Sequence, residues 1–173
     1  MDRDLGLVGL LVRVRDARPS EQDEIADLRV AAYRAGGHLS PGSAYEPMLR
    51  ELGSDGKSDL LVAEENGRVI GTVMVQYPPQ AGHVVQEADE AEVRALAVTP
   101  GAQGRGVGLA LVQAAISRAR RRGVRLLVLC TQPDMATAHR IYERAGFSRL
   151  AERDWTPDGE VTLLAYGLVL GAG

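Results

Sequence analysis

The chain has 173 residues, of which 45% are hydrophobic and 25% are charged, and its formal net charge is −3. This length and composition favour one compact soluble domain, and the slightly negative charge argues against a protein that binds nucleic acid through its overall charge. With one cysteine, Cys130, and no Cys/His cluster, the sequence excludes internal disulfides, zinc fingers and thiol redox motifs, and it predicts no metal site.

The amino-terminal residues 1–11 are expected to be an extension of a kind that can be disordered, followed by a single domain over residues 12–170. The apolar run at residues 5–12 is broken by two glycines and followed at once by Arg13 and Arg15, so it is too short to span a bilayer. It also lacks a convincing cleavage site for a signal peptide. We therefore expect a cytoplasmic protein without a membrane partner.

Hydrophobic patterns in the first half of the chain predict a strand, two helices and a hairpin. Residues 10–17 alternate weakly between apolar and polar, as in a half-buried strand. Residues 20–37 have apolar positions at helical spacing and acidic residues in the first turn, and residues 43–53 predict a second, short helix. Residues 59–78 predict a hairpin, because two β-rich runs flank the Asn-Gly pair at 66–67.

The second half of the chain alternates strands and helices. The expected elements are a strand, a helix, a strand, a helix and a closing hairpin, at residues 92–98, 107–122, 124–131, 133–146 and 148–170. The second of these strands is apolar throughout, which is typical of a central strand buried on both faces. Cys130 belongs to this strand and is expected to be a small buried residue rather than a nucleophile. The order of elements predicts an α/β protein with a mixed sheet.

A glycine-rich loop, QGRGVG at residues 103–108, connects a predicted strand to a predicted helix. The first amides of a helix have no partner within the helix and lie at the positive end of its dipole, so this corner predicts a phosphate-binding site. An alternative is a turn that needs glycine only for a positive φ. A dinucleotide fingerprint is excluded because its sixth position is Leu109, and a P-loop is excluded because Glu51 occupies the place of its first glycine.

Two motifs in the expected order resemble those of the GNAT-type N-acetyltransferases. Residues 103–108 match the family's (Gln/Arg)-x-x-Gly-x-(Gly/Ala) pyrophosphate motif, and the preceding residues 96–100 are similar to its Leu-Ala-Val-x-Pro strand ending. Residues 138–147 are similar to its Ala-x-x-x-Tyr-x-x-x-Gly-Phe helix. The resemblance implies an acyl-CoA N-acyltransferase fold, with a mostly antiparallel sheet that splays between strands four and five and is flanked by about four helices.

The resemblance also implies that acetyl-CoA is the cosubstrate. Its pyrophosphate would lie on backbone amides from Gly104 to Leu109, with Gly106 and Gly108 leaving room for it. Its pantetheine arm would pair with strand four like an added strand. The implied cofactor-binding residues are Leu96, Ala97, Val98, Gln103, Gly104, Arg105, Gly106, Val107, Gly108 and Leu109.

Three residues match the family's catalytic positions. The Leu96 amide would polarise the thioester carbonyl. Glu92, four residues earlier and expected on the same face of the strand, would be the general base; alternatively it is only the last acid of an acidic run. Tyr142 would protonate the departing thiolate; alternatively it is a buried aromatic residue of a helix.

The acceptor is expected to be a small cationic amine that attacks the thioester directly in a ternary complex. The segments expected near the acceptor are acidic, at Glu87, Asp89, Glu90, Glu92, Asp154, Asp158 and Glu160. An acidic entrance would attract cationic amines, although these residues could equally form solvated loops. Two alternatives stay open: acetylation of a protein N-terminus or lysine, and a non-catalytic acyl-CoA-binding domain. Because dimers are common in the family, the resemblance also suggests a homodimer.

Overall fold

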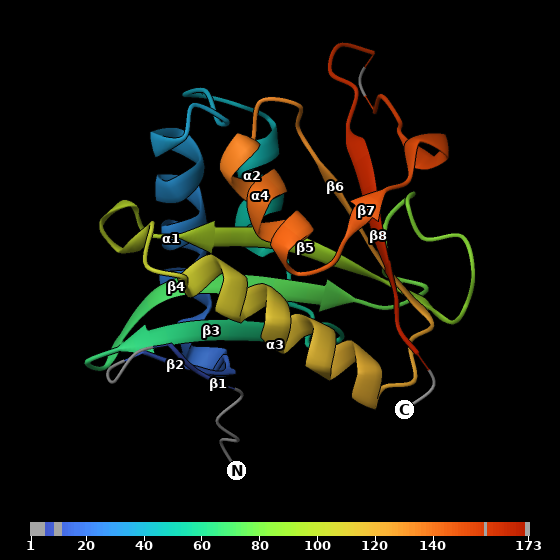
Figure 1. The fold of residues 1–173 in the computed structure, drawn as a ribbon. Coiled ribbons are helices and arrows are strands. Elements are labelled where there is room, and N and C mark those ends of the chain that lie inside the picture. Colours follow the sequence, from blue (N-terminus) through green and yellow to red (C-terminus); the bar gives the residue numbers. More distant parts are fainter. Residues whose placement is uncertain (1–5, 9–11, 158, 172–173) are drawn as a thin grey trace.

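The computed structural model describes residues 6–8, 12–157 and 159–171. They form one sheet with helices on both faces (Figure 1). The strands and helices are β1 (Gly6–Val8), β2 (Val12–Asp16), α1 (Gln22–Ala35), α2 (Tyr45–Glu51), β3 (Asp59–Glu65), β4 (Arg68–Gln76), β5 (Glu90–Val98), α3 (Val107–Arg121), β6 (Leu126–Thr131), α4 (Ala136–Arg144), β7 (Ser148–Arg149) and β8 (Leu164–Val169). Three short 3-10 turns are η1 (Pro19–Glu21), η2 (Pro100–Ala102) and η3 (Ala151–Arg153).

The sheet has eight strands in the order β1-β2-β3-β4-β5-β6-β8-β7. All neighbouring strands are antiparallel except β5 and β6, which are parallel and are connected through α3. This arrangement confirms the predicted mixed α/β sheet, and β5 and β6 are the strands expected as four and five. The predicted hairpin is β3–β4, whose turn residues Asn66 and Gly67 have φ values of 50° and 76°, as a two-residue hairpin turn requires.

Apolar residues cover both faces of the sheet, in separate clusters. The largest cluster joins α3 to the sheet through residues such as Leu111, Val112 and Ala115, and it also includes Tyr142 of α4. A second cluster joins α1 to the opposite face through Ile25 and Leu28. The two pairs of helices, α1 with α2 and α3 with α4, therefore lie on opposite sides of the sheet (Figure 1).

The predicted closing hairpin is only partly correct. Instead of a continuous strand over residues 148–155, the chain forms the two-residue β7, then η3, and then a single bridge from Trp155 to Leu163. The reason is an ion pair: Arg153 in η3 donates hydrogen bonds to both oxygens of the buried Glu90 carboxylate at 2.8 and 2.9 Å. This contact draws the segment toward β5 and away from regular pairing with β8.

The amino-terminal extension differs from the expectation where the structure describes it. Residues Gly6–Val8, expected to lie outside the domain, form β1 and pair antiparallel with β2 at the edge of the sheet. Residues 1–5 and 9–11 of the expected extension lie outside the described residues. In the described part of the chain, no helix combines the length and the apolar character that crossing a membrane needs.

Candidate active site

The main cleft opens where the two parallel strands separate. Pairing between β5 and β6 is limited to three positions and ends at Glu92 opposite Val128, although β5 continues to Val98. Beyond that point the strands diverge (Figure 1), and a cleft of about 670 Å³ lies between them. Its walls come from β5, the start of α3, the end of β6, α4 and the end of α1. The predicted splay between strands four and five is therefore present.

The glycine loop forms one end of this cleft. Gly106 is the N-cap of α3 with φ of 83°, and the first backbone bond of the helix runs from the Ala110 amide to the Gly106 carbonyl at 3.1 Å. The amides of Val107, Gly108 and Leu109 therefore have no partner within the helix, and these three residues line the cleft. The loop thus presents amides at the positive end of a 15-residue helix, as phosphate binding requires.

The backbone conformation of the loop and the packing of α3 also require these glycines. Gly104 and Gly106 both have left-handed φ values, 76° and 83°, which favour glycine over any residue with a Cβ atom. At Gly108, a Cβ atom would lie 2.8 Å from Cδ1 of Ile141, so its absence lets α3 approach α4 closely. These observations support the alternative that the glycines are needed by the turn and by helix packing, and they leave the expected room for pyrophosphate as a prediction.

Nearly all of the predicted cofactor-binding residues lie along one wall of the cleft. Those that line it are Leu96, Ala97, Val98, Gln103, Gly104, Gly106, Val107, Gly108 and Leu109. Arg105 is the exception, because its guanidinium is held by the Glu65 carboxylate at the end of β3. The Arg105 side chain is therefore paired and does not line the cleft.

Two further arginines, which the sequence analysis did not identify as site residues, line the cleft. Arg140 and Arg144 lie one turn apart on α4, and both are exposed. They bring positive charge to the same cleft as the helix N-terminus of α3. Their spacing of four residues places them on one face of the helix, and this signal was available in the sequence.

Tyr142 lines the cleft from α4, with 7% of its surface exposed. Its ring packs near Phe147 and Tyr166, at centroid distances of 6.0 and 6.4 Å. Its hydroxyl makes no hydrogen bond to the described residues, and burial raises the pKa of the phenol above its usual value. The hydroxyl is therefore protonated at neutral pH and can donate to a group in the cleft.

A bulge in β5 changes the expected relation between Glu92 and Leu96. Opposite β4, the register shifts between Arg94 and Ala97, and Ala95 has a φ of 53°. The extra residue reverses the alternation of side chains, as a bulge does. Ala97 now packs with α1, whereas Leu96 packs with the α3 side of the sheet. The expectation that Glu92 and Leu96 share a face is therefore wrong.

Glu92 lies on the α1 side of the sheet, at the end of the paired part of β5. Its side chain is 6% exposed and accepts a hydrogen bond from the Gly82 amide at 2.8 Å, and Arg94 Nε is 3.9 Å from its Oε1. Burial raises the pKa of the carboxyl, and the nearby Arg94 charge and the Gly82 amide only partly oppose this effect. Glu92 does not itself line the cleft, but its neighbours Arg94 and Cys130 do.

Loop residues around Glu92 form the other end of the site. The ring of His83, in the β4–β5 connection, lies 4.6 Å from that of Trp155. Cys130, at the end of β6, is half-buried, and burial raises the pKa of its thiol to about 11, so it is no activated nucleophile. Chain segments distant in sequence thus meet beside Glu92.

Several acids of the expected entrance are paired with arginines. Asp89 pairs with Arg125 at 2.9 Å and Asp154 with Arg149 at 2.7 Å, and Glu90 is buried against Arg153. Asp158, also part of that expectation, lies outside the described residues. Paired acids attract a cationic ligand weakly, so these three contribute little to the steering expected from the sequence.

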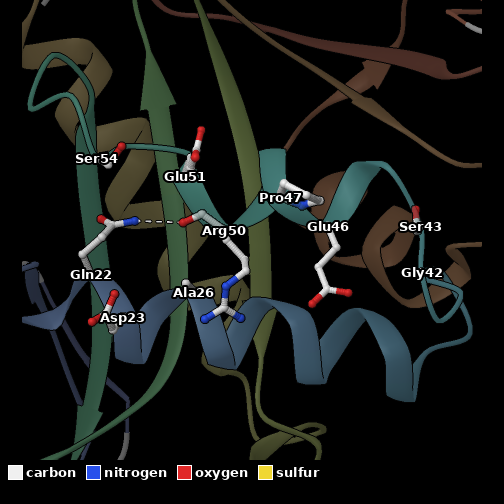
Figure 2. A pocket seen from close by; sticks show the side chains of 10 residues that line it. All are labelled: Gln22, Asp23, Ala26, Gly42, Ser43, Glu46, Pro47, Arg50, Glu51 and Ser54. Atoms are coloured by element: carbon white, nitrogen blue, oxygen red, sulfur yellow. Dashed lines mark hydrogen bonds between the residues drawn. The ribbon is translucent and has the colours of Figure 1, made fainter.

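A second hollow, of about 590 Å³, lies between α1 and α2 (Figure 2). Gln22 crosses it to donate a hydrogen bond to the Arg50 carbonyl at 3.1 Å. The Arg50 and Glu46 side chains are paired with Asp27 and Arg34, both at 2.6 Å. Because two of its charged side chains are already paired with residues of α1, this hollow offers less for chemistry than the cleft. In the described part of the chain, no three possible metal ligands gather at one place.

Comparisons with known proteins agree with this geometry. The family model described as "Acetyltransferase (GNAT) family" matches residues 23–147. A mycothiol acetyltransferase of Cellulomonas flavigena is 33% identical over 135 residues, which are 75% of this chain but 39% of that protein. The chain thus spans less than half the length of this relative.

Solved structures share the whole fold. A GCN5-related N-acetyltransferase from Kribbella flavida has a TM-score of 0.71 at 24% identity, covering 92% of this chain and 98% of that one. The Salmonella typhimurium protein yncA, solved with its cofactor acetyl-CoA, has a TM-score of 0.69 at 22% identity, covering 94% and 96%. At these identities the likeness concerns the fold.

Proposed function

The chain belongs to the acetyltransferase (GNAT) family, and from this premise we propose that it transfers the acetyl group of acetyl-CoA to the primary amine of a small molecule. The observation that carries the proposal is the cleft between β5 and β6, which joins a helix N-terminus, Tyr142 and the surroundings of Glu92. The name of the mycothiol acetyltransferases supports a small-molecule acceptor.

The phosphates of the cosubstrate fit the glycine-loop end of the cleft. The amides of Val107, Gly108 and Leu109 would bind the pyrophosphate, and Arg140 and Arg144 would balance its negative charge. After Glu92, the edge of β5 that no longer pairs with β6 would bind the pantetheine arm by backbone hydrogen bonds.

Acetyl-CoA supplies an acetyl group activated as a thioester. The acceptor amine attacks the carbonyl carbon directly, so a C–N bond forms as the C–S bond breaks. Glu92 takes the proton of the amine, directly or through one water molecule, and its raised pKa suits it to this role. Tyr142 gives its proton to the departing thiolate, and the Leu96 amide stabilises the negative charge that develops on the carbonyl oxygen.

Calorimetric titration with acetyl-CoA tests the binding part of this proposal. We expect the wild type to bind, and a double variant Arg140→Gln/Arg144→Gln to bind about tenfold more weakly, because charge-assisted contacts to phosphate are lost. The matched control is Arg120→Gln/Arg121→Gln, in which two exposed arginines at the end of α3, away from the cleft, are changed.

The catalytic part is tested by release of free thiol from acetyl-CoA in the presence of a panel of primary amines. Turnover that depends on an amine supports the proposal. If the wild type does not bind acetyl-CoA, or binds it but acetylates no amine of the panel, the proposed function is wrong.

A further inference from the structure

Arg29 of α1 is a buried cation with an unused hydrogen-bonding edge. Its side chain is 0% exposed, and its Nη1 donates hydrogen bonds to the carbonyls of Leu49 at 3.2 Å and Leu52 at 2.7 Å. Its Nε and Nη2 are also buried, and neither has a hydrogen-bond partner among the described residues. These two nitrogens form one edge of the guanidinium, the edge that binds both oxygens of a carboxylate in parallel.

The surroundings of Arg29 do not balance its charge. Burial lowers the pKa of Arg29 to about 10, and the positive charge of Arg94 lowers it further, while the phenols of Tyr33 and Tyr45 act in the opposite direction. Within the described ranges, no carboxylate is among the groups that shift this pKa. A buried cation beside a second cation is an unfavourable arrangement, and an anion placed between them would relieve it.

Of these two arginines, Arg94 lines the cleft, whereas Arg29 is fully buried and does not. Arg94 and Tyr33 line the cleft, and Tyr33 follows Arg29 by one turn of α1. Ala95, at the bulge of β5, packs against the apolar cluster that includes Tyr33 and the neighbours of Arg29 on α2. The Nε of Arg94 is also 3.9 Å from the Glu92 carboxylate. A carboxylate held by Arg94 would therefore lie close to an amine positioned at Glu92, as two groups of one small molecule can.

We propose that the acceptor carries a carboxylate close to its amine, and that Arg94 and the free Nε–Nη2 edge of Arg29 bind it. The inference rests on the proposed function and specifies its substrate class: a free amino acid, or a short peptide whose carboxylate reaches the same place. Arg94 meets the carboxylate from the cleft. Because Arg29 itself does not line the cleft, its binding to the carboxylate requires Tyr33, which lines the cleft one turn along α1, to move aside when the acceptor binds.

Matched acceptors test the proposal. Thiol release from acetyl-CoA is measured with free amino acids, with the corresponding α-amides and with dipeptides. Without an anion site the amide would be the better acceptor, because removal of the neighbouring negative charge makes the amine easier to deprotonate. We expect kcat/KM to be at least tenfold higher for the acid than for its amide. Dipeptide activity comparable to that of free amino acids would assign the carboxylate to a peptide terminus.

Variants connect this preference to the two arginines. In Arg94→Gln and Arg29→Met, we expect the acid-to-amide ratio of kcat/KM to fall by at least tenfold, mainly through KM. The matched control is Arg34→Gln, which removes an exposed arginine of the same helix that pairs with Glu46. If Arg29→Met does not fold, the test uses Arg94→Gln instead. In addition, calorimetry measures how tightly the wild type binds an N-acetylated amino acid and its amide when CoA is present.

The outcomes separate the two proposals. Acetylation of amines with no preference for the acid overturns the anion site and leaves the proposed function standing. Failure to bind acetyl-CoA, or turnover of no amine, overturns the proposed function. If no acceptor is turned over, equal binding of the N-acetylated acid and its amide overturns the anion site, whereas tighter binding of the acid that Arg94→Gln abolishes supports it.

Discussion

At the scale of single residues, burial decides what the candidate catalytic groups can do. Glu92 and Tyr142 are 6% and 7% exposed, and burial raises the pKa of both side chains. The same physical cause therefore makes a carboxylate more basic and keeps a phenol protonated. The shift brings the carboxyl pKa closer to neutral pH, which suits a general base, whereas it leaves the phenol protonated but makes it a weaker acid.

Substitution of Tyr142 by Phe tests the general acid. We expect kcat to fall by roughly 10²-fold, because the thiolate would leave without a proton donor, while the affinity for acetyl-CoA stays within about twofold. Steady-state kinetics and calorimetry measure the two quantities. The packing around the ring is retained, so the thermal midpoint should change little. A variant that turns over at the wild-type rate would show that Tyr142 is only a core residue.

The pH profile tests Glu92. A base acts when it is deprotonated, so kcat/KM should rise with pH as the Glu92 carboxyl loses its proton. Because burial raises its pKa, that rise should lie at higher pH than for an exposed glutamate. In Glu92→Gln, this limb of the profile should disappear together with most of the activity. If the variant keeps the limb, another group is the base.

At the scale of elements, the decisive feature is the corner between β5 and α3. The left-handed φ values at Gly104 and Gly106 let the chain leave the strand and begin the helix with its first amides facing the cleft. Within β5, before this corner, the bulge at Ala95 moves Ala97 to the α1 side of the sheet. A turn and a bulge thus determine which groups at this corner face the cleft and which face α1.

Substitution of Gly106 by Ala tests this corner. A Cβ atom at φ of 83° costs about 1–2 kcal/mol of stability, and any relaxation of the loop moves the amides of α3. We therefore expect a lower free energy of unfolding and weaker acetyl-CoA binding. Gly101→Ala is the matched control, since φ at Gly101 is not positive and nothing lies within 4 Å of the position that its new methyl group would take. Equal effects of the two substitutions would contradict the argument.

At the scale of the whole molecule, the site exists because two parallel strands stop pairing. Parallel strands need a crossover, here α3, and that crossover places a helix N-terminus at the point where β5 and β6 separate. The backbone groups left unpaired in the cleft are a cost to the free protein, and a ligand that pairs with them offsets it.

Thermal unfolding tests this view of the cleft. A ligand that binds the folded chain at about 100 times its Kd adds roughly 2.7 kcal/mol of stability. For a chain of this size, that corresponds to a rise in Tm of about 5–10 °C. We expect this rise with acetyl-CoA and a much smaller one with adenosine at the same concentration. Equal rises in Tm with both compounds would show that the pantetheine and phosphate groups contribute little to binding.

The sequence by itself predicted the features that depend on neighbouring residues. Apolar spacing predicted α3, the Asn-Gly pair predicted the β3–β4 turn, and the motif around Gly106 predicted the helix N-terminus at the cleft. Each of these is local, because periodicity, turn chemistry and helix ends are properties of a few consecutive residues.

Only the tertiary structure decided which charges are paired and which side chains share a face. Pairs such as Arg153 with Glu90 join residues 63 positions apart, and they neutralise part of an entrance that looked acidic in the sequence. The bulge at Ala95 reversed the expected faces of β5, and the burial of Arg29 against α2 left one edge of a cation unpaired among the described residues. Long-range contacts fix burial and charge pairing, and a single sequence does not specify them.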